Sequence, residues 1–155
     1  MAKTITPAPV KRSVEVKVSQ ARAFEVFTKK TSSWWPKSHH IGKTAMTEAI
    51  IEPKVNGRWY EIDEDGTECQ WGHVIAWSPP ESVTLAWQLN AQFQFDPELV
   101  TEVEVKFIAL GPSLTRVELE HRLLERFGDL AEKIRGQVDG GWPQILAAFA
   151  EATKS

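Results

Sequence analysis

The sequence predicts an α+β domain: a curved antiparallel sheet of six to seven strands wrapped around a long C-terminal helix, with two short helices after the first strand. Segments in which apolar and polar residues alternate recur between residues 13 and 125, as in strands with one buried face. Short turns such as Asn56-Gly57 and the EDG of 64–66 join consecutive segments, which favours antiparallel pairing. Residues 141–154 repeat their apolar positions at helical spacing and can cover the buried face.

The first strand and the two short helices are expected within residues 13–35. Residues 13–18, SVEVKV, alternate strictly and predict a strand, and Ser19 is a suitable N-cap for a helix that follows it. TSSWW, at 31–35, predicts a second short helix that ends before the following proline. The stretch 1–12 contains two prolines and no apolar signal region, so we expect an extended N-terminal arm and then a single domain over 13–153.

Six further strands are expected at 47–53, 58–63, 67–77, 82–89, 100–110 and 114–125. Gly72, inside the third of these, indicates a bulge or a close approach of another backbone. The alternating charges of TEVEVK and TRVELE predict a solvated sheet face with cross-strand charge pairs, and a partner-docking surface is the alternative.

Two helical segments, 128–138 and 141–154, are expected at the C-terminal end. Pro143 fits best in the first turn of the second segment. If one helix runs through both, Gly140, Gly141 and Pro143 should kink it. The two glycines are expected to allow close packing of the helix on the sheet, and an anion site at a helix start is the alternative.

Composition excludes several classes of function. The net charge is −3, with no basic stripe, which argues against a nucleic-acid-binding surface. No apolar run reaches the length of about 18 residues that a membrane span needs. Cys69 is the single cysteine, so the chain has no internal disulfide and a reducing cytoplasm is the expected location. With no obvious basic partner, Cys69 is expected to be an inert thiol.

Several motifs occur in a characteristic order. GRWYEIDEDGTECQWGHVIAWSPPESVTLAW spans 57–87, TRVELEH spans 115–121, and Gly141-Trp142 precedes Leu146. This order resembles the Activator-of-heat-shock-protein-ninety-ATPase-homologue-like (Aha1-like) family of the START-like (SRPBCC, helix-grip) superfamily. The resemblance implies a cavity for hydrophobic or amphipathic small molecules. Roles in that superfamily include lipid or hormone carriage, aromatic polyketide cyclisation and help to a chaperone, so a chaperone partner is implied by the family resemblance alone.

Seven tryptophans in 155 residues suggest a wide core or a lined cavity. We therefore expect a non-catalytic protein that binds a hydrophobic or aromatic small molecule of undetermined identity. The residues expected to form the site are Trp35, Trp59, Glu61, Trp71, Trp87, Phe93, Phe107, His121 and Trp142. Glu61 and His121 are the expected polar anchors. Glu61 faces inward only if Trp59 does, and the other register places Tyr60 and Ile62 inside.

Two other classes of function stay open: a cyclase- or hydrolase-type enzyme that uses Glu61 or His121 as acid or base, and a protein-interaction module that acts through the outer sheet or a homodimer contact. No cofactor is expected. No metal is expected either, because adjacent histidines such as His39 and His40 point in different directions and fit a solvent-exposed loop.

The neighbours Trp34 and Trp35 are expected to contact different parts of the interior, since residues next to each other on a helix project about 100° apart. Our assignment places Trp34 under the first helix, against Phe24 or Phe27, and Trp35 at the rim of the cavity. The reverse assignment fits the sequence equally well.

Overall fold

The structure, a computed structural model, describes residues 8–154. Seven strands form one antiparallel sheet in the order β1-β7-β6-β5-β4-β3-β2. Their bounds are β1 Val10–Val16, β2 Met46–Ile51, β3 Arg58–Asp63, β4 Glu68–Ser78, β5 Ser82–Trp87, β6 Thr101–Gly111 and β7 Leu114–Arg122. The helices are α1 Gln20–Lys29, α2 Thr31–Trp34 and α3 Ala131–Ala152, and a 3₁₀ segment, η1, covers Leu124–Leu130. The predicted α+β class, strand number and pair of short helices are confirmed.

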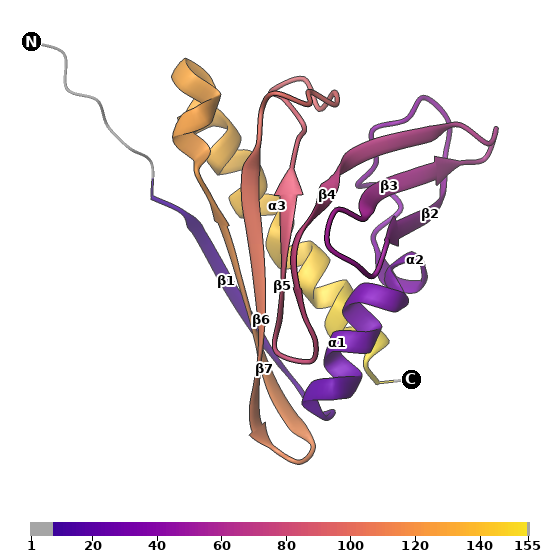
Figure 1. Cartoon of the computed structure of the whole chain (residues 1–155), viewed down its shortest axis with the longest axis vertical. Coiled ribbons are helices and arrows are strands. Elements are labelled where there is room, and N and C mark those ends of the chain that lie inside the picture. The colour runs from indigo at the N-terminus through magenta and orange to yellow at the C-terminus, as the bar shows by residue number, and fades with distance from the viewer. Residues whose placement is uncertain (1–7, 155) are drawn as a thin grey trace, which may run out of the picture.

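The long helix α3 runs along one face of the sheet, and α1 and α2 lie near its C-terminal end (Figure 1). The sheet curves around α3, so the alternating apolar residues of the central strands point toward the helix. No helix within residues 8–154 is long and apolar enough to cross a membrane.

The N-terminal elements follow local signals with one shift. The Ser19 hydroxyl accepts a hydrogen bond from the Arg22 amide at 3.2 Å, which confirms the predicted cap of α1. The first strand lies at 10–16 rather than 13–18, because its ladder to β7 pairs Val10 with His121 at one end and Val16 with Thr115 at the other. The strand thus takes in part of the predicted arm, and the arm's first seven residues lie outside the described chain.

Gly72 confirms the expected close backbone approach in β4. A Cβ atom at this position would collide with the carbonyl oxygen of Ala86 on β5. The register between β3 and β4 also shifts at Trp59 and Tyr60, opposite this glycine. The shift bends the sheet where its tryptophans gather.

The C-terminal helix follows the second of the two alternatives, one helix through both predicted segments. Segments 128–138 and 141–154 are not separate, because α3 is continuous from 131 to 152 and contains Pro143 in its interior, not in a first turn. Proline lacks an N–H, so the carbonyl of Asp139 has no intrahelical partner at this point. The guanidinium of Arg12 on β1 supplies it, donating to Asp139 O at 3.3 Å and to Asp139 Oδ1 at 2.7 Å. A contact with the sheet thereby compensates for the proline.

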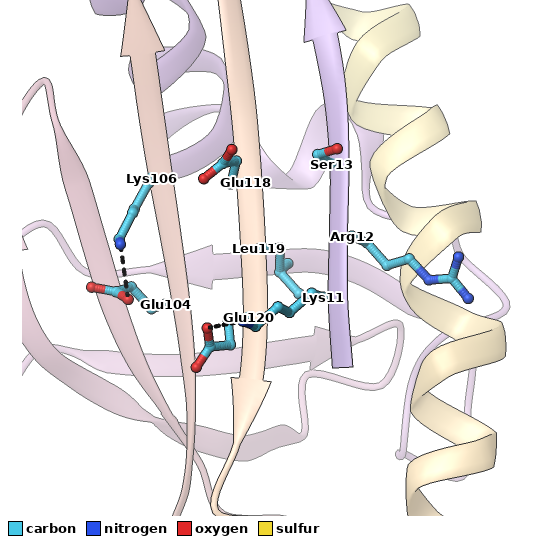
Figure 2. Close-up of a pocket in the computed structure, with 8 residues that line it drawn as sticks. All are labelled: Lys11, Arg12, Ser13, Glu104, Lys106, Glu118, Leu119 and Glu120. Atoms are coloured by element: carbon cyan, nitrogen blue, oxygen red, sulfur yellow. Dashed lines mark ion pairs between the residues drawn. The ribbon is translucent and has the colours of Figure 1, made fainter. Parts of the chain in front are cut away.

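The outer face of the sheet carries charge pairs, of which Lys11–Glu120 and Arg122–Glu102 join neighbouring strands as predicted and Lys106–Glu104 lies within β6. Lys11 on β1 pairs with Glu120 on β7, and Lys106 pairs with Glu104 on β6, around a shallow polar depression of about 330 Å³ (Figure 2). Arg122 joins the neighbouring strand through Glu102 at 3.0 Å. Such solvent-exposed pairs contribute at most about 1 kcal/mol each, and seven of the eight residues that line the depression are charged or polar.

Candidate ligand-binding cavity

A hollow of about 270 Å³ lies between the sheet, α3 and the loop that follows α2. Its wall consists of Trp35, Ser38, His39, His40, Ile41, Trp71, Trp87, Leu89, Phe93 and Ile145. We call this hollow the inner cavity. A second hollow of about 480 Å³, the outer cavity, shares His39, Trp87, Phe93 and Ile145 with it and continues along α3. The shared residues place the two hollows next to each other, on either side of the same aromatic side chains.

The tryptophans of the wall hold one another in place. The ring centroid of Trp35 lies 5.0 Å from that of Trp71 and 6.2 Å from that of Trp142. Trp59 and Trp87 extend the same network, with centroids 5.8 Å apart and rings edge to face. The indole N–H of Trp35 donates to the His39 carbonyl at 2.8 Å. This bond fixes the ring of Trp35 and, with it, the start of the loop above the cavity.

Phe93 stands at the mouth of both cavities in a strained conformation. Its φ is 57°, in the left-handed region that favours glycine, and its side chain is 38% exposed. The turn is built on Asn90, whose side-chain oxygen accepts hydrogen bonds from the amides of Gln92 at 2.9 Å and Gln94 at 3.0 Å. Backbone strain that the surroundings enforce often marks a functional position. Here it presents an exposed aromatic ring to the hollow.

The glycines of α3 leave the outer cavity open. A Cβ atom at Gly136 or Gly140 would meet no other atom within 4 Å, and one at Gly141 would meet only His39 Nε2, at 4.0 Å. The prediction that Gly140 and Gly141 allow close packing on the sheet is therefore wrong. A glycine inside a helix costs about 0.5–1 kcal/mol relative to alanine. No closer packing offsets that cost here. The missing side chains instead leave room in the outer cavity, which these glycines line.

His121 is locked behind the wall. The indole of Trp142 donates to His121 Nδ1 at 3.2 Å, so the ring proton resides on Nε2 and is donated to the Thr101 hydroxyl oxygen at 2.8 Å. Thr101 in turn donates to the carbonyl of Trp87 at 3.3 Å. Burial lowers the pKa of His121 to about 3, which keeps the ring neutral. His121 thus positions Trp87 and Trp142 and presents no free nitrogen to the cavity.

Glu61 is fully buried, and Trp59 beside it on the same strand face is too, which resolves the register of β3. Glu61 Oε1 accepts from the Ile41 amide at 2.6 Å and from the Trp71 indole at 2.9 Å, and Oε2 accepts from the Gly42 amide at 3.3 Å. Burial would raise the pKa of Glu61, but the hydrogen bonds it accepts hold that pKa below its ordinary value. The carboxylate therefore anchors the loop above the cavity to the wall.

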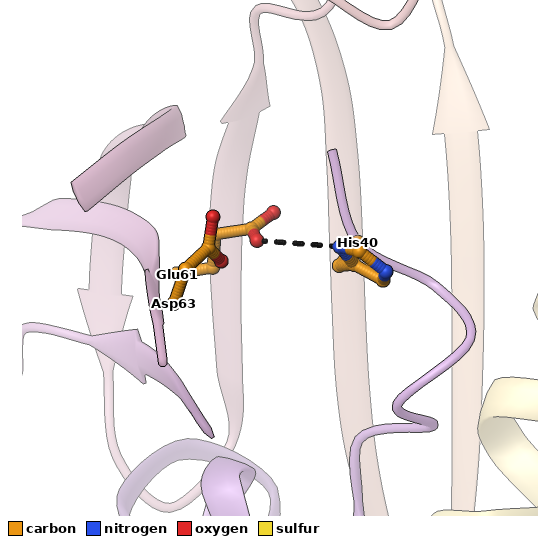
Figure 3. A group of neighbouring side chains, drawn as sticks. All are labelled: His40, Glu61 and Asp63. Atoms are coloured by element: carbon orange, nitrogen blue, oxygen red, sulfur yellow. Dashed lines mark ion pairs between the residues drawn. The ribbon is translucent and has the colours of Figure 1, made fainter. Parts of the chain in front are cut away.

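Asp63 and His40 complete a polar group next to Glu61 (Figure 3). His40 Nδ1 lies 3.7 Å from Glu61 Oε2, and the His40 side chain is 26% exposed. The histidine pair lies in a loop as predicted, but its free exposure to solvent is wrong: both residues are partly buried, His40 faces a buried carboxylate and His39 lines both cavities. Burial, together with the neighbouring Glu61, raises the pKa of Asp63 to about 6.

Cys69 lies beside the same carboxyl groups. Its Sγ is 3.8 Å from Asp63 Oδ2. Burial and the neighbouring carboxylates raise the pKa of this thiol to about 11, so it is not a thiolate at neutral pH.

The structure divides the nine residues expected at the site into three groups. Five line the two cavities: Trp35, Trp71, Trp87, Phe93 and Trp142. Trp59, Glu61 and His121 lie directly behind the wall and hold it. Phe107 lies instead against Phe24 and Phe27 of α1, with ring centroids 5.2 and 5.8 Å away, and lines neither cavity.

Asp63 was missed from the sequence, and the histidines of the loop were considered but not assigned to the site. The alternation W-x-E-x-D in 59–63 could have placed Asp63 on the same face as Glu61, since side chains two apart on a strand share a face. No local pattern could have shown that the loop at 40–42 covers these carboxyl groups, because the contact joins segments about twenty residues apart.

The curved seven-stranded antiparallel sheet with its long C-terminal helix is the helix-grip fold. A protein described as a START superfamily protein from Mycobacterium smegmatis matches with a TM-score of 0.63 over 94% of this chain and 97% of its own, at 14% identity. Residues 17–154 match the family described as Activator of Hsp90 ATPase homolog 1-like protein. The chain belongs to that family. No curated protein sequence matches it.

Two solved structures are more similar in sequence. One is described as the anthrahydroquino-gamma-pyrone synthase Txn09, with 40% identity, a TM-score of 0.67 and coverage of 94% of this chain and 97% of that one. The other is described as the self-sacrificing resistance protein CalC from Micromonospora echinospora, with 34% identity, a TM-score of 0.71 and coverage of 94% and 93%. These descriptions concern a biosynthetic enzyme and a resistance protein on the same fold.

Proposed function

We propose that this protein binds a hydrophobic, polycyclic aromatic small molecule in the adjoining inner and outer cavities. The observation that carries the proposal is the aromatic wall formed by Trp35, Trp71, Trp87 and Phe93, on which a flat ring system can stack. Ligand sites are typically concave, mostly apolar and provided with a few polar groups. Here His39 and Gln144 supply polar groups at the edge of the outer cavity.

Phe93 offers the sharpest test, because the same loop contains a matched control. Phe93 and Phe95 are both 38% exposed, and Phe93 alone of the two lines the cavities. Anthraquinone-2-sulfonate, a water-soluble tricyclic aromatic, serves as the probe, and quenching of tryptophan fluorescence reports its binding. We expect Phe93→Ala to weaken binding about tenfold, the equivalent of about 1.4 kcal/mol, and Phe95→Ala to leave it unchanged. Equal effects of the two variants, or no quenching in the wild type, would contradict the proposal.

A second candidate is an enzyme of the cyclase class in the same cavity, which the similarity to a described synthase favours. Both acid–base residues expected from the sequence lie behind the wall. His121 has both ring nitrogens hydrogen-bonded, whereas Glu61 Oε2 accepts only a 3.3 Å bond from Gly42, so Glu61 is the stronger candidate. Conversion of a bound polyketide-like compound that is lost in Glu61→Gln, while the variant still binds the compound, would favour this enzyme.

A further inference from the structure

The polar group of His40, Glu61 and Asp63 beside the cavity contains two carboxyl groups, and the residues around it do not neutralise both of their negative charges. Glu61 is fully buried and Asp63 is 3% exposed. The two carboxyl groups lie close enough that a hydrogen bond between them forms if one holds a proton. Among the described residues, the basic group beside them is the imidazole of His40. Two ionised carboxylates at such a site repel each other unless a proton or a cation lies between them.

Lone pairs in this group are left free and converge. With both acids ionised, Asp63 Oδ1 and His40 Nδ1 are buried atoms without a hydrogen-bond partner in residues 8–154. Glu61 Oε2 accepts only the long 3.3 Å bond from Gly42, whereas Oε1 accepts two shorter ones. One ligand-type atom from each of the three residues lies within 4.8 Å of the other two. Figure 3 shows the three side chains facing one another from β3 and the loop.

We propose that His40, Glu61 and Asp63 bind a divalent transition-metal cation of the zinc class. A neutral imidazole and two carboxylates are a ligand set suited to Zn²⁺ or Co²⁺, and fewer than four protein ligands leave positions for water or a ligand. The amides of Ile41 and Gly42 and the Trp71 indole act as the outer support, since they orient the Glu61 carboxylate.

The backbone at Gly42 gives the site its shape. A Cβ atom at this position would overlap the Asp63 carboxylate, so glycine is what allows the loop to close over the acid. His40 also lines the inner cavity, so a bound cation lies at the edge of that cavity. These contacts define the cation site whatever organic ligand occupies the cavity.

Cobalt and zinc binding to the full chain tests the site directly. After treatment with a chelator, the wild type is titrated with Co²⁺ and followed by visible absorption, and with Zn²⁺ by calorimetry. We expect one equivalent of either metal to bind. Bound Co²⁺ should show a ligand-field absorption band, and either metal should raise the melting temperature of the protein. His40→Gln and Asp63→Asn should each weaken binding at least about tenfold.

Asp65→Asn is the matched control, because it removes the same charge two residues further on. The Asp65 carboxylate is exposed and accepts a hydrogen bond from the Thr67 amide, and it stands outside the group of three. This variant should bind Co²⁺ like the wild type. His40 lies in a loop, so His40→Gln tests the proposal even if Asp63→Asn does not fold. No stoichiometric binding in the wild type, or binding that neither variant weakens, would overturn it. An Asp63→Asn protein that is merely more stable, with no metal effect in the wild type, would show that a shared proton neutralises the pair instead.

Discussion

The two ends of the interior are both rich in aromatic rings, yet one is filled and the other is hollow. At the filled end, Phe24 and Phe27 of α1 pack edge to face on Phe107, and Phe27 packs on Phe149 of α3. None of these four lines any of the three hollows described above. At the hollow end, the tryptophans touch one another along one side and border empty space on the other. Aromatic content alone therefore does not distinguish core from cavity.

Trp34 and Trp35 mark the boundary between the two ends. Trp34 donates to the Val26 carbonyl at 2.8 Å, and its ring lies 5.2 Å from Phe27 and 5.5 Å from Phe149, all at the filled end. Trp35 donates to the His39 carbonyl and packs on Trp71 in the cavity wall. The two rings contact each other at 5.7 Å. What separates them is the end of α2, which turns successive side chains in different directions.

Truncation at the filled end should cause the largest loss of stability. Phe27→Ala removes a fully buried ring that contacts three other aromatic residues. We expect it to lower the free energy of unfolding by about 3–5 kcal/mol, because of lost burial and the space left behind. Urea unfolding measures this loss. The folded fraction should still bind anthraquinone-2-sulfonate with wild-type affinity, and weaker binding would mean that the two ends are not independent.

The free energy of unfolding should depend on pH through His121, which is buried as a neutral ring behind the cavity wall. The unfolded histidine titrates near pH 6.5 and the folded one at about 3, so the unfolded state binds more protons between these values and stability falls as pH falls. The expected slope is about 1.4 kcal/mol per pH unit below pH 6.

The comparison that isolates this slope is urea unfolding of the wild type and His121→Gln at pH 7, 6 and 5. The raised pKa of Asp63 acts in the opposite direction between its unfolded value and about 6. That contribution is common to both proteins and cancels in their difference. Parallel pH curves for the two proteins would show that His121 is not held neutral in the fold.

At Phe93, substitution by glycine should destabilise the protein less than substitution by alanine, although alanine is the more stabilising residue at most positions. At φ 57° an alanine keeps the backbone strain that a glycine relieves, so Phe93→Gly should be more stable than Phe93→Ala by about 1 kcal/mol. Both should lose affinity for the aromatic probe. Thermal unfolding compares the two variants, and a more stable alanine variant would show that the turn around Asn90 does not impose this conformation.

The smallest effect is expected on α3. Gly140→Ala should stabilise the protein by about 0.5–1 kcal/mol, because a Cβ atom there meets nothing and alanine favours the helix. Gly140→Leu extends into the outer cavity and should weaken probe binding while leaving the helix intact. Circular dichroism and fluorescence quenching measure the two effects. If the leucine variant binds the probe as the wild type does, the outer cavity is not part of the site.

Most of the fold, but only part of the candidate site, could be predicted from the sequence. Alternation and turn residues located all seven strands, since each signal lies within a few residues, and the cap at Ser19 fixed the start of α1. Pro143 was predicted in the first turn of a helix but lies inside α3. The carbonyl left without a partner by this proline accepts a hydrogen bond from Arg12, which is more than a hundred residues away in the sequence. The register of β3 was undecidable from its pattern, because the donors that make a buried Glu61 acceptable belong to the loop at Ile41 and Gly42.

Nuclear magnetic resonance of the indole N–H groups shows directly whether an aromatic ligand binds at the hollow end and not at the filled end. Single Trp→Phe variants assign the seven signals, and anthraquinone-2-sulfonate is then added to the wild type. We expect large shifts for Trp35, Trp71 and Trp87, which line the inner cavity, and little change for Trp34 at the filled end. A shift of Trp34 as large as that of Trp35, or no shift in any of them, would contradict this expectation.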